Sequence, residues 1–420
     1  MRDYRAKIVS DIDHIIIAND SASINGGAAK VAIIEAKALA ATGRRVTFFA
    51  PSGPIDQGML DAGVEVVCLN QPDLVDEPNR LTAIGRGFWN SEAANKLAEL
   101  VDAADPQRAI IHGHTFSRGL SPAFGPVLTS GKLPHVYTMH EYFLACPNGG
   151  FYDYQRNEIC KRKALGVSCL TTNCDQRHPA HKLWRVARQA VLRSAGKLPS
   201  GLTDVIYISQ TQLNAMRSYL PADARLHYLS NPNEINGDSP RVEVEQSDIF
   251  LFVGRWAPEK GCVDFARAAK EAGVRAVFLG AGPEEQAIRE ANPEAELVGW
   301  ASPQEVDEWM RRSRALVFPS LWYEGQPLVS MEALSMGLPV IVADWNAGAE
   351  QIENDVTGLI YHAREDLGAM LSKMTEQTAK RLSEAAFSRR ESYGTSLDAH
   401  VESLIGIYGQ AQQNIRVLLK

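Results

Sequence analysis

The stretch FPSLWYEGQPLVSMEALSMGLPV, residues 318–340, determines how the second half of the chain folds. An apolar run at 315–318 leads into it and predicts a buried strand. A polar loop comes next, and residues 327–336 then have the pattern of a helix that Pro327 begins and Gly337 ends. A strand, a loop and a helix N-terminus in this order predict a turn whose backbone N–H groups bind an anion.

Two carboxylates flank this predicted turn. Glu324 lies in the loop before the helix, and Glu332 lies in the second turn of the helix. Carboxylate oxygens accept hydrogen bonds, so these two side chains can bind the hydroxyl groups of a sugar. The stretch therefore predicts a place where an anion and sugar hydroxyls meet.

The composition is that of an ordinary globular protein. The chain has 420 residues, of which 45% are hydrophobic and 22% charged, and this length predicts two or three domains with full cores. No apolar run reaches the length of about 18 residues that a membrane-spanning helix needs, and the N-terminus lacks the apolar core of a signal peptide. We therefore expect a cytoplasmic protein. The net charge of −7 argues against a nucleic-acid partner.

Strands and helices alternate from the start of the chain. Residues 13–19 predict a strand, 28–41 an Ala-rich helix and 45–49 a second strand, with Gly26 and Gly27 in the first loop. Adjacent glycines allow a backbone to approach a ligand closely, although a plain tight turn has the same sequence. The alternation resumes after a polar segment at 231–247, which we interpret as a linker. The pattern predicts two doubly wound α/β domains with ligands between them.

Several polar residues fall at predicted strand ends, where open parallel sheets bind ligands. Arg255 and Lys260 lie in the loop GRWAPEKG (254–261), between a strand and a helix, where two cations can neutralise a diphosphate. His140 lies at the end of another predicted strand. Each of these residues, taken alone, is equally compatible with an ordinary structural or surface role.

Residues 142–201 interrupt the alternation and predict an insertion over one edge of the first sheet. They contain four cysteines, Cys146, Cys160, Cys169 and Cys174. In a cytoplasmic chain, clustered cysteines predict a structural zinc site before disulfides, although this spacing lacks a CxxC knuckle. Unlinked thiols beneath a loop are the alternative.

The same insertion is strongly basic. Residues 156–197 contain ten lysines or arginines and two acidic residues, a net charge of +8, which leaves −15 for the rest of the chain. Such a segment is either a solvated face or a contact for an anionic partner, such as a membrane surface or a lipid phosphate. Charge patterning alone does not separate these two interpretations.

The ordered set of motifs resembles the family 4 retaining glycosyltransferases, which have the GT-B fold of two facing Rossmann-like domains. The second half carries GRWAPEKG, the 318–340 stretch with its E-x7-E spacing, and DVTGLIY (355–361). The first half carries NGG (25–27), HGH (112–114) and TMHE (138–141). This resemblance implies an N-terminal acceptor-binding domain, 1–235, which the helix 397–417 would join, and a donor-binding domain, 247–395.

The resemblance also implies roles for individual residues. Arg255 and Lys260 would hold the diphosphate of a nucleotide sugar, Glu332 would bind the ribose and Glu324 the donor sugar. The turn beside the sugar and phosphates would be formed by Gly325, Gln326, Pro327 and Leu328. Gly26 and Gly27 would line the diphosphate from the other domain, and His140 would lie near the reacting sugar.

The implied activity is transfer of a hexose, with retention, from a UDP- or GDP-linked donor to a glycan or lipid-linked acceptor, in polysaccharide or glycolipid biosynthesis. Such enzymes need no metal for catalysis. With the basic segment, the resemblance predicts peripheral contact with the inner face of an anionic membrane. Two alternatives stay open: another GT-B enzyme, such as an epimerase or a phosphorylase, and a sugar-nucleotide-binding scaffold.

Overall fold

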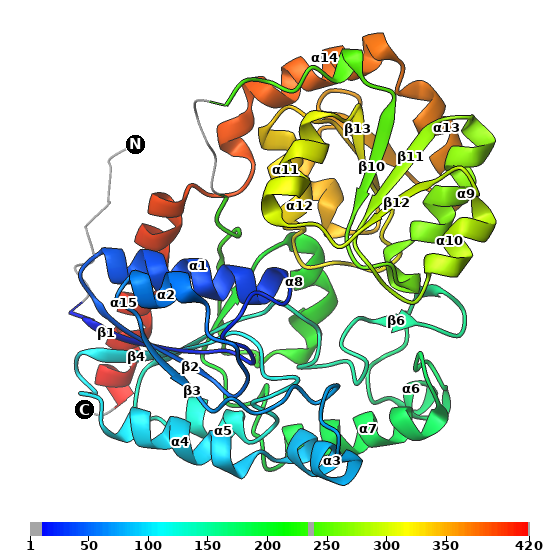
Figure 1. Ribbon diagram of the computed structural model, residues 1–420. Helices are drawn as coiled ribbons and strands as arrows, with labels where there is room; N and C mark the ends of the chain where they lie inside the picture. Colours follow the sequence, from blue (N-terminus) through cyan, green and yellow to red (C-terminus); the bar gives the residue numbers. More distant parts are fainter. Residues whose placement is uncertain (1–10, 234–238, 419–420) are drawn as a thin grey trace.

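The first of two α/β units is built around a seven-stranded parallel sheet (Figure 1). The computed structural model describes residues 11–233 and 239–418. The strand order is β3-β2-β1-β4-β5-β8-β9. The strands are β1 (His14–Ala18), β2 (Arg45–Ala50), β3 (Glu65–Cys68), β4 (Ala109–Gly113), β5 (His135–Thr138), β8 (Asp204–Tyr207) and β9 (Arg225–Tyr228).

Both faces of this sheet are covered, as the run HIIIA of β1 requires. Ile16 packs in the core on one side, while Ile15 and Ile17 pack in the core on the other, which follows from the two-residue period of a strand. In Figure 1, α1 and α2 lie on one side and α4 and α5 on the other. The helices are α1 (Gly27–Ala41), α2 (Gln57–Asp61), α3 (Arg80–Phe88), α4 (Ser91–Asp102), α5 (Phe124–Leu128) and α8 (Gln210–Met216).

The second unit contains a six-stranded parallel sheet with the order β12-β11-β10-β13-β14-β15. Its strands are β10 (Ile249–Val253), β11 (Arg275–Leu279), β12 (Glu296–Gly299), β13 (Ala315–Phe318), β14 (Val340–Ala343) and β15 (Gly358–Tyr361). Its helices are α9 (Cys262–Ala272), α10 (Glu285–Ala291), α11 (Pro303–Arg311), α12 (Leu328–Ser335), α13 (Leu367–Lys373) and α14 (Glu376–Ser388). The predicted α/β fold with two doubly wound units is confirmed.

The insertion between β5 and β8 forms a subdomain of its own. It contains an antiparallel pair, β6 (Tyr152–Asp153) with β7 (Glu158–Ile159), and two helices, α6 (Val167–Thr171) and α7 (Pro179–Arg193). Trp184 of α7 packs edge-on against Phe88 of α3, with ring centroids 5.6 Å apart. The insertion is therefore anchored to the first unit.

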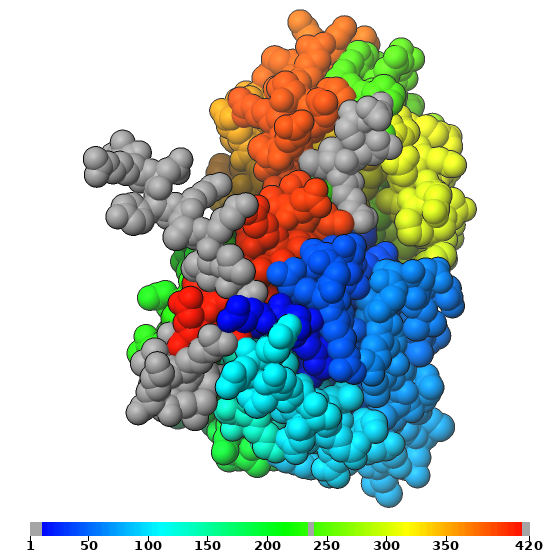
Figure 2. Space-filling view, turned by 90° about the vertical axis from the view of Figure 1, so that its left-hand side faces the viewer, coloured from blue at the N-terminus to red at the C-terminus, as the bar shows by residue number. Residues whose placement is uncertain are grey.

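The last helix, α15 (Leu397–Leu418), returns from the second unit to the first. Leu404 and Tyr408 are buried in the same core as the strand residues Ile15 and Ile17. In Figure 2 the red atoms of this helix lie against the blue N-terminal part of the chain. The predicted linker 231–247 and the predicted boundary at 235 lie partly outside the described residues, as do residues 1–10. None of the described helices is long and apolar enough to cross a membrane.

Candidate active site

The loop between β13 and α12 lies against the first unit. Its backbone contacts the first unit directly: the hydroxyl of Tyr142 donates to the carbonyl oxygen of Glu324. A Cβ atom on Gly325 would lie 3.0 Å from Ile208 Cδ1 and 3.3 Å from the carbonyl oxygen of His140. A larger residue would push these neighbours apart by a few tenths of an ångström, so glycine allows the loop and the end of β5 to lie close together. Glu324 itself has a φ of 55°, a left-handed conformation that is rare for its residue type.

The Glu324 carboxylate forms the centre of a charged cluster. Its Oε1 lies 2.7 Å from Lys260 Nζ and accepts a hydrogen bond of 2.5 Å from Ser320 Oγ. The Lys260 ammonium also lies 4.9 Å from the centroid of the Trp322 ring. The strand–loop–helix stretch thus brings an acid and a base together that are 64 residues apart in the chain.

Arg255, like Lys260, lies just before the start of α9. Its guanidinium is 58% exposed and forms an ion pair with Glu259, whose carboxylate is buried. Arg255 and Lys260 both come just before α9, which begins at Cys262. Two cations next to a helix N-terminus are groups that can bind a diphosphate when they are released from their carboxylate partners.

Glu332 is paired across the cleft with a residue that the sequence did not single out. Lys30 Nζ, in the first turn of α1, lies 2.6 Å from Glu332 Oε1, in α12. The glycine loop lies close by, since a Cβ atom on Gly27 would lie 3.7 Å from Leu328 Cδ1. Gly26 is the N-cap of the same helix α1. The structure therefore brings the predicted residues of the two units face to face.

The side chain of Gln326 is engaged elsewhere. Its Oε1 accepts a hydrogen bond of 2.6 Å from the Asn231 N–H, and its Nε2 donates to Ser230 Oγ at 2.8 Å. Pro327 is the N-cap of α12 and leaves no backbone N–H at that position. A second clasp joins the units where Glu350 accepts hydrogen bonds from the N–H groups of Gln210 and Thr211. Gln326 thus holds the two units together.

His140 is half-buried at the end of β5, and its Nε2 lies 2.9 Å from His114 Nδ1. Burial, followed by the neighbouring His114, lowers the pKa of His140 to about 3. The imidazole is therefore neutral at physiological pH. It donates one hydrogen bond from its protonated nitrogen, accepts one at the other nitrogen and carries no positive charge.

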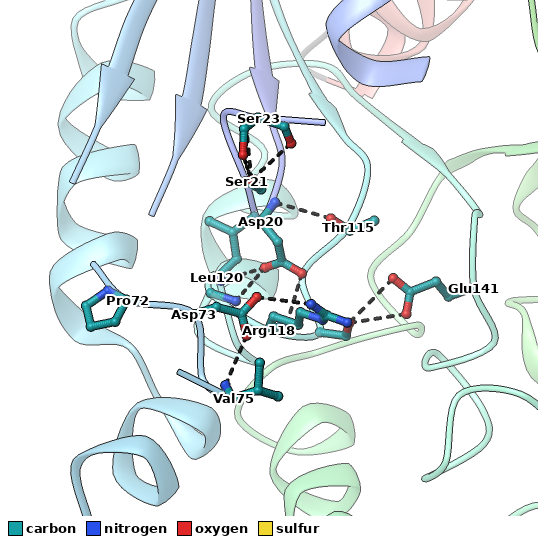
Figure 3. Close-up of polar contacts among 12 residues, drawn as sticks. Asp20, Ser21, Ser23, Pro72, Asp73, Val75, Thr115, Arg118, Leu120 and Glu141 are labelled. Atoms are coloured by element: carbon teal, nitrogen blue, oxygen red, sulfur yellow. Dashed lines mark hydrogen bonds and ion pairs between the residues drawn. The ribbon is translucent and has the colours of Figure 1, made fainter. Parts of the chain in front are cut away.

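A polar cluster lies next to His140 on the first unit (Figure 3). The Asp20 carboxylate accepts hydrogen bonds from the backbone N–H groups of Arg118, Gly119 and Leu120, at 2.7 to 2.9 Å. Glu141 accepts a hydrogen bond of 3.2 Å from Ser117 Oγ. Burial, then the nearby Asp20, raises the pKa of Glu141 to about 7.

Glu141→Gln is expected to remove a pH dependence of stability. The ordinary pKa of a glutamate, 4.5, applies to the unfolded chain, and the folded value is about 7. Between these values only the unfolded chain loses its proton, so the wild type loses stability as pH rises to about 7 and no more above it. A shift of this size, reduced for partial exposure, corresponds to about 1–3 kcal/mol.

Urea unfolding at pH 5 and pH 8 measures this effect. The difference in unfolding free energy between Glu141→Gln and the wild type should increase toward pH 8 in favour of the variant. The exposed Glu308→Gln serves as the matched control and should leave the difference constant. Parallel pH profiles for Glu141→Gln and the wild type would show that the Glu141 carboxyl titrates normally.

The geometry does not support the predicted zinc site. All four cysteines are free, and among the residues that the structure describes their sulfurs do not come close enough to share one ion. The buried ammonium of Lys182 lies among them instead, 3.1 Å from Cys174 Sγ and 3.6 Å from Cys169 Sγ. The sequence could not show that a lysine from α7 enters the cluster.

The basic segment divides into internal and surface groups. Arg188 is buried and donates to the carbonyl oxygen of Gly87, while Arg185 and Arg162 are paired with buried Asp175 and Asp153. The remaining group lies at the surface. There a depression of about 540 Å³ is lined by Lys161, Lys163, Ala164, Arg193, Ser218 and Tyr219, together with the paired Arg162.

Two family models match the chain. Residues 26–232 match the glycosyl transferase 4-like domain, and residues 247–378 match glycosyl transferases group 1. Together they take in most of the chain, and each falls on one of the two units. The chain belongs to the glycosyltransferases that these two models describe.

Curated members of these glycosyltransferases are similar over part of their length. An Escherichia coli UDP-Gal:alpha-D-GlcNAc-diphosphoundecaprenol alpha-1,3-galactosyltransferase is 30% identical over 31% of this chain and 37% of its own. The putative teichuronic acid biosynthesis glycosyltransferase TuaC of Bacillus subtilis is 25% identical over 60% of this chain and 57% of its own. The chain thus spans between about a third and about 60% of the length of these relatives.

Solved structures with this GT-B fold match along nearly the whole chain. The sucrose-phosphate synthase of Thermosynechococcus elongatus has a TM-score of 0.67 at 16% identity, covering 96% of this chain and 100% of its own. Anabaena HepE, in complex with UDP-glucose, has a TM-score of 0.62 at 16% identity, covering 97% and 99%. At such identities these likenesses establish the fold.

Proposed function

We propose that the protein transfers a hexose from a UDP- or GDP-linked donor to a glycan or lipid-linked acceptor, with retention of configuration. The observation that carries the proposal is the Lys260–Glu324 pair, in a stretch whose Gly325 lies against the His140 backbone and whose Leu328 lies against Gly27 of the other unit. Here a cation that can bind a diphosphate lies beside a carboxylate that can bind sugar hydroxyls. The nucleotide complexes of the structural neighbour HepE and the galactosyltransferase among the relatives support this assignment.

In this proposal charge stabilisation drives the reaction. When the bond between the sugar and the diphosphate breaks, negative charge develops on the leaving phosphate, where Arg255, Lys260 and the α9 N-terminus stabilise it. The acceptor oxygen bonds to the anomeric carbon on the face that the phosphate leaves, and its proton passes to the leaving phosphate, so the configuration is retained. The ion pair between Lys260 and Glu324 opens, and Glu324 then binds hydroxyl groups of the donor sugar. The protein cations supply the positive charge, so we expect catalysis without a metal ion.

A donor screen tests this function. The protein is incubated with a panel of UDP- and GDP-sugars and glycan or polyprenyl-diphosphate-linked acceptors, and release of nucleoside diphosphate is measured. Acceptor-dependent release, and a product with the anomeric configuration of the donor by NMR, is the expected result. Donor binding without turnover across the panel would favour the scaffold alternative, and an isomerised donor would favour an epimerase.

We further propose that the insertion contacts an anionic membrane, and that it does so at the inner face of that membrane. Lys161, Lys163 and Arg193 of the basic depression have no carboxylate within ion-pairing distance anywhere in residues 11–233 and 239–418. Exposed apolar side chains accompany them on the insertion, namely Val167, Leu170 and Leu183. Cations with neighbouring exposed apolar groups are typical of a surface that binds anionic lipid headgroups.

Charge reversal at this surface is expected to abolish lipid binding. The triple variant Lys161→Glu, Lys163→Glu and Arg193→Glu should bind vesicles of phosphatidylglycerol at least ~100-fold more weakly, since each cation contributes about 1 kcal/mol. Co-sedimentation at low and high salt measures this. A matched triple reversal on the second unit, Arg267→Glu, Lys270→Glu and Lys380→Glu, should bind like the wild type. Salt-insensitive binding, or equal loss in both variants, would contradict the proposal.

A further inference from the structure

A buried chain of polar groups runs from His140 to the last helix of the protein. His140 Nε2 lies 2.9 Å from His114 Nδ1, and the two rings lie nearly parallel, at 16°. His114 Nε2 lies 3.4 Å from Glu35 Oε2, and Glu35 Oε1 lies 2.9 Å from His400 Nε2. The chain joins the end of β5 to β4, α1 and α15, and Glu35, His114 and His400 are each at most 2% exposed.

The far end of this chain has a defined protonation. His400 Nδ1 lies 2.9 Å from the carbonyl oxygen of Ser230, which can only accept, so this nitrogen carries a proton. Burial alone would raise the pKa of Glu35, but its neighbours His114 and His400 hold it well below its usual range. Glu35 is therefore a carboxylate, and His400 donates to it from Nε2 as well. Glu35 and His400 form a buried ion pair.

The protonation of His114 follows from its neighbours. His114 Nε2 and Glu35 Oε2 face each other at 3.4 Å, and neither has a hydrogen-bond partner among the described residues. A carboxylate attracts a proton toward itself, so the proton of His114 lies on Nε2. A second positive charge here would be uncompensated, because the single charge of Glu35 already faces His400 and the ring of His112 lies 4.2 Å away. His112 cannot take the place of His114 as the donor to Glu35, because both of its ring nitrogens are hydrogen-bonded elsewhere, to Tyr408 and Thr138, each at 2.8 Å. His114 is thus neutral and presents a lone pair at Nδ1.

We propose that Glu35, acting through His114, fixes His140 as the tautomer that is protonated at Nε2. His140 donates from Nε2 to His114 Nδ1 and keeps a lone pair at its own Nδ1. This lone pair can only accept, so His140 offers an acceptor to a substrate hydroxyl. Glu35, His114 and His400 are positioning residues in this scheme. The catalytic part of the inference rests on the proposed sugar transfer; the tautomer itself does not.

NMR of the wild type tests the tautomer directly. Long-range ¹H–¹⁵N spectra of protein labelled at histidine show which ring nitrogen carries the proton. The signals of His140 are assigned by their loss in His140→Gln. At pH 7.5 we expect a protonated Nε2 and an unprotonated Nδ1. A protonated Nδ1, alone or together with Nε2, overturns the inference, and this holds whether or not a donor has been identified.

Two substitutions of Glu35 test the effect on turnover. Glu35→Leu removes the acceptor for His114 and should lower kcat about 10- to 100-fold, while KM for the donor stays within about twofold. Glu35→Gln should keep kcat within about threefold, because its carbonyl accepts from His114 and its amide donates to a neutral His400. If turnover is preserved in Glu35→Gln, the fixed tautomer of His140 explains the effect of Glu35. If turnover is lost, the buried charge of Glu35 explains it.

The outcomes are separable. A folded Glu35→Leu with wild-type kcat, or a Glu35→Gln as damaged as Glu35→Leu, overturns the positioning role. Thermal unfolding reports whether each variant folds, and if Glu35→Leu does not, the wild-type spectrum decides. If the wild type turns over no donor while the spectrum shows the expected tautomer, the proposed function fails and the assignment of His140 stands.

Discussion

Glu324→Ala is expected to lower kcat by about two to three orders of magnitude while nucleotide affinity changes by less than about threefold. Glu324 lies in the loop that would hold the transferred sugar, whereas the cations that would hold the diphosphate remain in place. Interactions made with the reacting sugar are realised mainly in the transition state, so their loss appears in turnover.

Steady-state kinetics with the donor identified by the screen measures kcat, and calorimetry with the nucleoside diphosphate measures affinity. Alanine adopts the left-handed backbone of position 324 no more readily than glutamate, so the φ of 55° adds no separate effect. Glu308→Ala, on the exposed face of α11, is the matched control. A Glu324→Ala protein whose affinity falls as steeply as its kcat would assign Glu324 to the nucleotide instead.

Glu332→Ala is expected to weaken nucleotide binding about 10- to 100-fold, with a smaller effect on kcat. A hydrogen bond to a charged acceptor contributes roughly 1.5–3 kcal/mol, and this contribution is lost when the carboxylate is removed. In the described structure Lys30 Nζ lies 2.6 Å from this carboxylate, so a ribose must displace Lys30 or bind the carboxylate together with it.

A double-mutant cycle with Lys30→Met resolves that competition. A half-exposed ion pair contributes at most about 1 kcal/mol, so Lys30→Met alone should change affinity less than about fivefold. Once Glu332 is alanine, Lys30→Met should have no further effect, because the two side chains form one unit. Unchanged calorimetric affinity in Glu332→Ala would remove this residue from the ribose role, and additive effects would show that Lys30 acts independently.

The sequence predicted those features that depend on local order. The strand at 315–318, the loop with Glu324 and the helix that follows are each encoded by neighbouring residues, and the structure places them as β13, the loop and α12. Arg255 and Lys260 were found for the same reason, since a strand end and a helix start fix their position. Local patterns of this kind suffice to predict both sheets.

Contacts between distant segments could not be predicted in the same way. Lys30 and Glu332 are 302 residues apart, and Lys30 has the pattern of an ordinary polar position on α1. Glu35 on the same helix also looks like a solvent-facing residue, yet it is buried because α15 closes over it. The zinc prediction failed for a related reason, because a lysine from another element fills the space among the thiols.

The return of α15 to the first unit affects how the protein is made. The core around β1 and α1 includes Val401, Leu404 and Tyr408, which the ribosome adds after the second unit. Until then one apolar face of an otherwise complete N-terminal half has no cover, and the second unit must form in the meantime. We therefore expect that the N-terminal half does not fold stably alone, and that a chain that stops before residue 397 exposes that face to aggregation or to chaperones.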